Sequence, residues 1–379
     1  MISSRAKDIS PFIVMDVLDE AKAMEKAGED IIHLEVGEPD FDTPRVIKEE
    51  GYRALRNGIT HYTHSMGIIE LRETIAEHYF KRYGVDVSPN QIIVTSGTSP
   101  AMLLVFGALL NQGDEVVLSN PHYSCYPNFI RFVEGIPVFV DIFEKEGFQY
   151  DADEFRKKLS KKTKGIVVNS PANPTGAVLK KKVLEELANL PVFVISDEIY
   201  HGLIYEGEEH SMLEFTDRAF VLNGFSKLYA MTGWRLGYVI APKKFVRAMQ
   251  KLQQNLFISA SSFAQWAGIS ALKNAGKDVK KMVTTFNQRR LYMVNRLREL
   301  GFGIKVLPTG AFYVLANAKK FSENSYEFAF KILREAKVAV TPGIDFGTNA
   351  EGYIRFSYSN SIENIKEGMR RIEKFIKKI

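Results

Sequence analysis

The chain has 379 residues, enough to bury a large core and to form two domains or one large domain with an attached lobe. Apolar residues make up 45% of it, charged residues 25%, and the net charge is +5, which is ordinary globular usage and argues against a nucleic-acid-binding protein. The longest apolar run, 101–110, is far shorter than the ~20 residues that span a bilayer. Because Cys125 is the only cysteine and the N-terminus lacks the apolar stretch of a signal peptide, we expect a cytoplasmic protein without a disulfide or a membrane segment.

The first two thirds of the chain alternate between strand-like and helix-like patterns. An amphipathic helix is expected over 12–27, and the turn-rich segment 37–44 follows it. Short apolar runs then occur at 92–95, 115–118, 138–140, 165–169, 192–196, 220–222 and 238–240. Helical patterns lie between several of these runs, at 100–111 and 180–188. This alternation predicts an α/β fold with a mostly parallel, seven-stranded sheet that helices cover on both faces.

The last third predicts a smaller α+β domain. Long helical stretches are expected at 243–255 and 278–300. After them, strands at 310–315 and 353–358 are mixed with helices at 325–336 and 362–378. We therefore expect a large domain over 45–285 and a small domain that combines 1–44 with 286–379.

Polar residues come soon after several of the apolar runs. Ser96–Ser99 follows the first run, Asp197 and Glu198 follow the fifth, and Ser226 and Lys227 follow the sixth. In open α/β sheets, ligands bind beyond the carboxyl ends of the strands. We therefore expect these segments to meet in one crevice.

Two of these segments each allow two interpretations. The turn Ser96–Ser99 is an ordinary capped turn, with Thr98 or Ser99 as the cap and Pro100 opening the helix, or a turn whose amides bind a phosphate. Asp197 is a buried carboxylate at a strand end or the N-cap of a following helix.

Two basic residues stand in unusual surroundings. Lys227 follows a buried apolar run and precedes two aromatic residues, so desolvation is expected to lower its pKa toward the free amine that can form a Schiff base. Arg355 lies in a strand, on the face opposite Ile354 and Phe356. It is either an exposed strand arginine or a bidentate clamp for a carboxylate.

These motifs together resemble the fold-type I, pyridoxal-phosphate-dependent aminotransferases of class I/II. The strongest motif is Ser-Lys-x₅-Gly-x-Arg-x-Gly, present from Ser226 to Gly237, and 171–176 and 197–200 stand in the expected order before it. The resemblance extends over nearly the whole chain and is closest to the subgroup of prokaryotic aspartate, aromatic and alanine aminotransferases. It implies the cofactor pyridoxal 5′-phosphate, a fold-type I sheet and no metal.

The resemblance also implies a role for each site residue. Lys227 would form the internal aldimine and then act as general base and acid, and Asp197 would pair with the pyridinium nitrogen. Asn173 and Tyr200 would bond the cofactor's phenolate oxygen, and Tyr123 would stack on its ring. The phosphate would be held by Gly97, Thr98, Ser99, Ser226 and Arg235, with Tyr62 reaching it from the partner subunit of a homodimer. Arg355 would clamp the substrate α-carboxylate, assisted by Gly37 and Asn173.

One position departs from the pattern, and the substrate stays open. Many members carry a hydroxyl residue three positions before the lysine, where this chain has Gly224. The loop 61–67 contains no Arg or Lys, so we expect an L-α-amino acid with a neutral or aromatic side chain, with aspartate-like donors still open, and a 2-oxo acid such as 2-oxoglutarate.

Two other reactions or roles use the same scaffold. A C–S β-lyase is the first alternative, because the motifs do not separate it from a transaminase. A cofactor-sensing transcription regulator is the second. It would need an added N-terminal winged-helix region, and the pattern begins too near Met1 for us to expect one.

Overall fold

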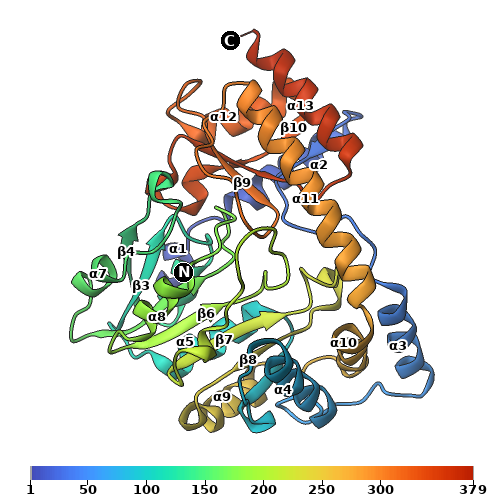
Figure 1. The fold of residues 1–379 in the computed structure, drawn as a ribbon, viewed down its shortest axis with the longest axis vertical. Coiled ribbons are helices and arrows are strands. Elements are labelled where there is room, and N and C mark those ends of the chain that lie inside the picture. Colours follow the sequence, from blue (N-terminus) through green and yellow to red (C-terminus); the bar gives the residue numbers. More distant parts are fainter. Residues whose placement is uncertain (1, 379) are drawn as a thin grey trace.

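The computed structural model describes residues 2–378, and its larger part is built on a seven-stranded sheet (Figure 1). The strand order is β2-β8-β7-β6-β5-β3-β4, and every strand is parallel to the others except β8, which is antiparallel to β2 and β7. The strands are β2 (Ile92–Thr95), β3 (Glu115–Asn120), β4 (Ile136–Asp141), β5 (Thr163–Asn169), β6 (Phe193–Asp197), β7 (Ala219–Gly224) and β8 (Gly237–Ile240). The predicted α/β class and mostly parallel sheet are confirmed.

Apolar side chains alternate between two cores, one on each face of this sheet. Along β5, for example, Ile166 and Val168 belong to one core and Val167 to the other. A strand buried on both faces reads as a continuous apolar run, which is why the sequence shows these strands so clearly.

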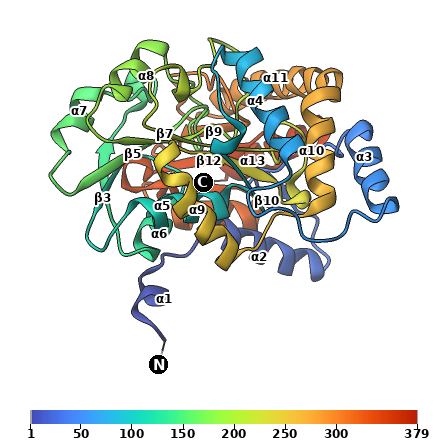
Figure 2. The ribbon, with the colours of Figure 1, turned by 90° about the horizontal axis from the view of Figure 1, so that it is seen from below.

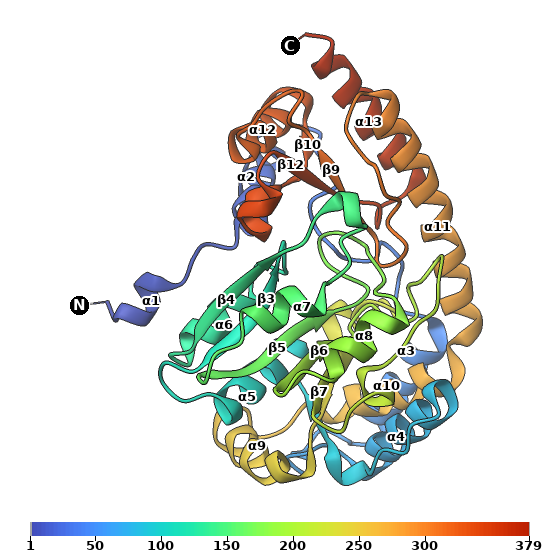
Figure 3. The ribbon, with the colours of Figure 1, turned by 60° about the vertical axis from the view of Figure 1, so that its left-hand side comes forward.

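Helices cover both faces, as Figure 3 shows. One face carries α5 (Thr98–Leu109), α6 (Tyr126–Phe132) and α9 (Lys243–Leu256). The other face packs against α4 (Ile69–Tyr83), α7 (Ala152–Lys157), α8 (Lys181–Ala188) and α10 (Ser262–Asn274), with α3 (Arg45–Arg56) packed on α10. Short 3-10 turns lie at η1 (Pro89–Gln91), η2 (Glu144–Glu146), η3 (Met212–Glu214) and η4 (Thr232–Trp234).

The smaller part combines the two ends of the chain. An antiparallel sheet β11-β12-β9 and a parallel pair β1-β10 pack with helices from both ends of the chain. Its strands are β1 (Ile32–His33), β9 (Tyr313–Asn317), β10 (Val338–Ala339), β11 (Thr341–Pro342) and β12 (Tyr353–Ser357). Its helices are α2 (Ile13–Lys26), α12 (Ser325–Lys331), the π-helical turn η5 (Ile332–Ala336), the 3-10 turns η6 (Gly343–Phe346) and η7 (Thr348–Ala350), and α13 (Ile362–Ile376).

The helix α11 (Gly276–Glu299) connects the two parts. It runs without interruption past residue 285, so the proposed division into 45–285 and 1–44 with 286–379 falls inside a helix. We keep that division as a proposal, and its end residues 1 and 379 lie outside the described residues. The short helix α1 (Ser4–Asp8) extends from the body at the N-terminus, as Figure 2 shows. No helix within 2–378 is both long and apolar enough to cross a membrane.

Three local expectations need correction. The helix α5 begins at Thr98, so Pro100 is not its first residue. The N-cap residue is Gly97, not Thr98 or Ser99 as expected, and it provides no side-chain cap. Residues 332–336 form a π-helical turn where a continuous α-helix was expected. Asp197 caps no helix, because a turn follows β6 there.

Candidate active site

A cavity of about 300 Å³ lies beyond the carboxyl ends of the strands. Asn169 and Asp197 are paired neighbours at the ends of β5 and β6, and Gly224 and Gly237 are paired where β7 ends and β8 begins. The segments that follow β5, β6 and β7, and the segment that precedes β8, therefore lie at one edge of the sheet. The predicted residues that line the cavity are Gly37, Thr98, Ser99, Tyr123, Asn173, Asp197, Tyr200, Ser226, Lys227, Arg235 and Arg355.

Two predicted residues do not line this cavity. Gly97 lies directly behind it: a Cβ atom added there would come within 2.7 Å of an Nη atom of Arg235. Tyr62 is 82% exposed and lies on the surface of the chain, so its predicted role toward a second subunit stays a prediction.

The turn from β2 into α5 suits a phosphate. Gly97 has φ of +99°, a backbone conformation that glycine adopts without strain, and its missing side chain leaves room for the guanidinium of Arg235. The amides at the start of α5 are therefore close to that guanidinium and to the hydroxyls of Thr98 and Ser99. Helix N-terminal amides and an arginine are the donors that a phosphate dianion prefers.

Gly224 stands where a hydroxyl residue was expected from the family pattern. A Cβ atom at this position would lie 3.1 Å from the Cα of Gly237 and 3.1 Å from the carbonyl oxygen of Leu236. Because both contacts are to backbone, a larger residue requires a shift of the β7–β8 pair. The close pairing of these strands therefore explains the departure, and Thr98 and Ser99 are the hydroxyls available nearby.

Lys227 lies at the floor of the cavity. Its Nζ donates a hydrogen bond of 2.7 Å to the carbonyl oxygen of Gly37. Burial lowers its pKa from the usual 10.5 to about 8. Among the charged neighbours, Glu38 opposes this shift while Arg355 adds to it. A useful fraction of the amine is therefore uncharged near neutral pH, as a Schiff-base lysine requires.

We expect this pKa to be visible in the protein without any added group. In trace acetylation of the unliganded protein over a pH series, the reactivity of Lys227 should rise as pH increases through about 8, because only the free amine reacts. A peptide lysine in the same tube should rise near its ordinary ~10.4. Peptide mass spectrometry measures both, and a Lys227 midpoint equal to that of the peptide would contradict this assignment.

Asp197 is a buried carboxylate at the end of β6, with 3% of its surface exposed. Its Oδ2 accepts a 2.6 Å hydrogen bond from the hydroxyl of Tyr126, and its Oδ1 accepts one of 3.2 Å from the amide of Ile199. Burial raises its pKa to about 6, and these hydrogen bonds oppose the shift. A cationic N–H placed beside this carboxylate would favour its charged form, so the site suits a protonated ring nitrogen.

A pair of tyrosines closes the cavity beside Asp197. The hydroxyls of Tyr200 and Tyr313 lie 2.8 Å apart, and both residues are almost fully buried. A Cβ atom at Gly37 would lie 1.7 Å from the Tyr313 hydroxyl, so a larger residue there requires the buried ring of Tyr313 to move.

Arg355 is buried, with 3% of its surface exposed, which excludes the surface interpretation. Its guanidinium donates to Oδ1 of Asn173 at 2.8 Å and to the carbonyl oxygen of Glu35. The guanidinium also lies 4.4 Å from the ring centre of Tyr313 and 4.7 Å from that of Phe346. Its Nε has no hydrogen-bond partner among residues 2–378. These contacts hold the fork in place, so that it is preorganised to bind an anion.

The outer wall of the cavity is apolar. It is formed by Phe12, Val14, Met15 and Met102, and the ring of Phe12 meets that of Tyr123 edge to face at 6.0 Å. Within residues 2–378, the only Lys and Arg residues that line the cavity are those already assigned, at 227, 235 and 355. A second carboxylate on a substrate therefore has no cation of its own among the cavity-lining residues of 2–378.

The sequence interpretation missed Tyr126 and Tyr313. Tyr126 stands three residues after Tyr123, and both line the cavity. Tyr123 lies just before α6 and Tyr126 is the first residue of that helix, so the closeness of Tyr126 to the predicted Tyr123 is the signal that could have found it. Tyr313 contacts the site from β9, more than a hundred residues after Tyr200, and no local pattern marks it.

Known proteins resemble this chain over its full length. A family model described as aminotransferase class I and II matches residues 29–372. The (5-formylfuran-3-yl)methyl phosphate transaminase of Methanocaldococcus jannaschii is 45% identical, with 100% of each chain covered. The aspartate aminotransferase of Pyrococcus horikoshii is 41% identical, covering 98% of this chain and 96% of that one.

A solved structure shares the architecture at similar identity. A Methanococcus jannaschii protein, described as similar in its active site to kynurenine aminotransferases, superposes with a TM-score of 0.92. It is 44% identical, and the match covers 99% of this chain and 100% of that chain.

Proposed function

Because this chain belongs to the class I and II aminotransferases, and is therefore a pyridoxal-phosphate-dependent transaminase of fold type I, we propose that its cavity holds pyridoxal 5′-phosphate and a substrate carboxylate together. The observation that carries this proposal is that one cavity joins Lys227, the buried Asp197, the phosphate-type turn and the buried Arg355. When bound, the cofactor supplies an aldehyde for amines and a ring that takes up the electrons released at the substrate Cα.

Each end of the cavity suits a different part of the cofactor. The phosphate would be held by the backbone and side chains of Gly97, Thr98, Ser99, Ser226 and Arg235. At the other end, the carboxylate of Asp197 would hold a proton on the ring nitrogen. Asn173 and Tyr200 would donate to the phenolate oxygen, and Tyr123 would cover a face of the ring.

Lys227 is proposed as the residue that moves protons. With a pKa near 8, its Nζ is available to take a proton from the substrate Cα and to return it at the neighbouring carbon. Its hydrogen bond to the carbonyl of Gly37 holds the amine in the cavity before the cofactor binds. Tyr200, beside it in the cavity, assists by orienting the reacting groups.

Arg355 is proposed to bind the substrate α-carboxylate, assisted by Asn173 and the backbone at Gly37. We expect Arg355→Ala to raise KM for both the amino acid and the oxo acid by about 10- to 100-fold, which corresponds to one or two charge-assisted hydrogen bonds. Steady-state kinetics with several substrate concentrations measures this change.

Arg355→Lys is the matched control, because it keeps the charge but loses the planar fork. Its KM should lie between those of the wild type and Arg355→Ala. An unchanged KM in Arg355→Ala would remove Arg355 from the carboxylate site.

We propose neutral or aromatic L-amino acids as donors, with a 2-oxo acid such as 2-oxoglutarate as acceptor. The apolar wall of Phe12, Val14 and Met102 supports this choice, because it can cover a hydrophobic side chain. Aspartate-like donors would need a cation from outside the described chain, for example from a second subunit.

A second amino acceptor is included in the same test. One relative at 45% identity is named for a furan aldehyde that carries a phosphate. The apolar wall can cover a furan ring, and an arginine fork such as that of Arg355 suits a phosphate as well as a carboxylate. We therefore propose (5-formylfuran-3-yl)methyl phosphate as an alternative amino acceptor.

The test is a screen of amino donors against acceptors, with formation of the new amino compound as readout. Transfer from neutral or aromatic donors supports the proposal, and activity confined to aspartate and glutamate would overturn the substrate class. Release of pyruvate and ammonia from a cysteine-like substrate, without transfer, would identify the lyase alternative. The phosphate-bearing aldehyde forms its own arm of the screen.

We further propose a homodimer with shared sites and a reducing, cytoplasmic environment. Tyr62 is 82% exposed on a single chain, which is costly for a large aromatic residue and suits a place at a subunit contact. The one cysteine, Cys125, is free, which suits a compartment where thiols stay reduced. Sedimentation of the purified protein and its dependence on concentration measure the first of these proposals.

A further inference from the structure

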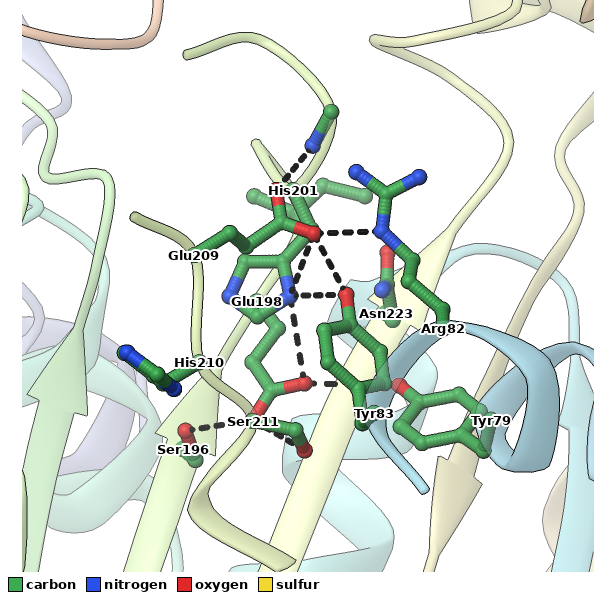
Figure 4. Close-up of polar contacts among 12 residues, drawn as sticks. Tyr79, Arg82, Tyr83, Ser196, Glu198, His201, Glu209, His210, Ser211 and Asn223 are labelled. Carbon is green, nitrogen blue, oxygen red and sulfur yellow. Dashed lines mark hydrogen bonds and ion pairs between the residues drawn. The ribbon is translucent and has the colours of Figure 1, made fainter. Parts of the chain in front are cut away.

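The turn that follows β6 has two faces. Asp197, Ile199 and Tyr200 line the cavity, whereas Glu198 and His201 are not among its lining residues. Both rear residues are buried, with 1% and 6% of their surfaces exposed. Figure 4 shows the polar contacts behind the turn. Buried polar side chains therefore pack against the turn on the side that does not line the cavity.

Glu198 is held by donors on several segments. Its Oε1 accepts hydrogen bonds of 3.0 Å from the hydroxyls of Ser196 and Ser211 and from the amide of Met212. Its Oε2 accepts a longer bond of 3.4 Å from the hydroxyl of Tyr79 in α4. Burial raises the pKa of this carboxyl, and these bonds oppose the shift. A buried carboxylate with this many donors acts as a junction between segments.

Glu209 ties the other end of the turn to α4. Its Oε1 accepts hydrogen bonds from Nε of Arg82 at 2.5 Å and from the hydroxyl of Tyr83 at 2.7 Å, and its Oε2 accepts one from the amide of Gly202. Burial opposes ionisation here, but attraction by His201 and Arg82 outweighs it and lowers the pKa of Glu209 to about 2. The amide of Gly202 is thus fixed by a charged group.

His201 joins the two carboxylates. Because the hydroxyl of Tyr83 donates to Glu209, it must accept from Nδ1–H of His201, which lies 2.7 Å away. The same Nδ1 lies 3.5 Å from Oε2 of Glu198 and 3.8 Å from Oε1 of Glu209. The Nδ1 atom of His201 therefore lies between the carboxyl groups of Glu198 and Glu209, and one network holds both ends of the turn.

We propose that Glu198 is a positioning residue for the proposed transaminase reaction: through His201 and Glu209 it fixes the turn so that Asp197 and Tyr200 meet the cofactor in register. This inference rests on the proposed function. A glutamine at position 198 has one oxygen and one NH₂ group, so it would turn a donor toward the donors that now surround the carboxylate. The turn should then relax, and the front residues should shift.

The test compares Glu198→Gln with the wild type and with Glu208→Gln as a matched control. Glu208 lies on the same loop, but its side chain is 86% exposed. In Glu198→Gln, we expect kcat to fall and the Kd for pyridoxal 5′-phosphate to rise, each by about 10-fold, as for other residues that orient a site from behind. The pH midpoint of the bound cofactor's absorbance should also move, while KM for the amino acid stays within about twofold. Glu208→Gln should match the wild type in all four measurements.

Tyr83→Phe is a second variant, because it removes only the hydroxyl that links His201 to Glu209. It should change the same three quantities in the same direction, by a smaller factor. A lowered melting temperature with unchanged kcat, cofactor Kd and absorbance midpoint in both variants would overturn the positioning role. A wild-type protein that binds no cofactor would instead refute the proposed function itself.

Discussion

Lys227→Ala should lose amino transfer almost completely, with kcat/KM falling by about 10⁴-fold or more. This is the upper end of what one positioned proton-transfer group supplies, and Lys227 is also the only amine that lines the cavity within residues 2–378. The neighbouring cations Arg235 and Arg355 cannot replace it, because a guanidinium stays protonated. Coupled assays of the new amino acid measure the loss.

Two variants control for this change. Lys227→Arg keeps a positive charge and should be as inactive as the alanine variant, because charge is not the function of this residue. Lys182→Ala removes a lysine whose side chain is 84% exposed, and it should behave like the wild type. Turnover of Lys227→Ala at even a tenth of the wild-type rate would contradict its assignment as the residue that moves the protons.

Asp197→Asn should keep the shape of the site but lose about 100-fold or more in kcat. The carboxylate, which accepts hydrogen bonds from Tyr126 and the backbone amide of Ile199, would hold a proton on the ring nitrogen. The side-chain amide of asparagine has no negative charge with which to hold that proton. Loss of one preorganised charge at a reacting group has an effect of this size. Single-turnover kinetics measures the chemical step directly.

The variant should still bind the cofactor, since the phosphate contacts around Arg235 are untouched. Asp217→Asn is the control, because Asp217 is an exposed residue in the turn before β7. A wild-type rate in Asp197→Asn would exclude the carboxylate from the reaction. Loss of cofactor binding would instead give Asp197 a structural role.

Most of the site could be predicted because it lies at the ends of buried strands. Asn173, Asp197 and Lys227 each come after an apolar run, and parallel strands end at one edge of a sheet. A local pattern was therefore enough to place them near each other. The family motif favoured the carboxylate clamp over the exposed strand arginine for Arg355, and its burial excludes the exposed position.

The rest of the structure depends on contacts between distant segments. Tyr313 enters the site from the smaller part of the molecule, and its signal in the sequence is that of any core tyrosine. The helix α10 was not predicted, because its buried face consists largely of small residues such as Ala264, Ala267 and Gly268, which give little hydrophobic periodicity. The predicted cap of α5 was wrong for a related reason. Gly97 stands at the N-cap beside the guanidinium of Arg235, and this contact between distant segments cannot be read from the local sequence.

The most direct test of the central claim is to locate the cofactor on the chain. Purified protein supplied with pyridoxal 5′-phosphate should be reduced with borohydride, digested and mapped by mass spectrometry. We predict one modified peptide, with the reduced cofactor on Lys227, and no modification after excess amino donor is added first. Modification of another lysine instead, or none at all, would contradict the claim that Lys227 carries the chemistry of this site.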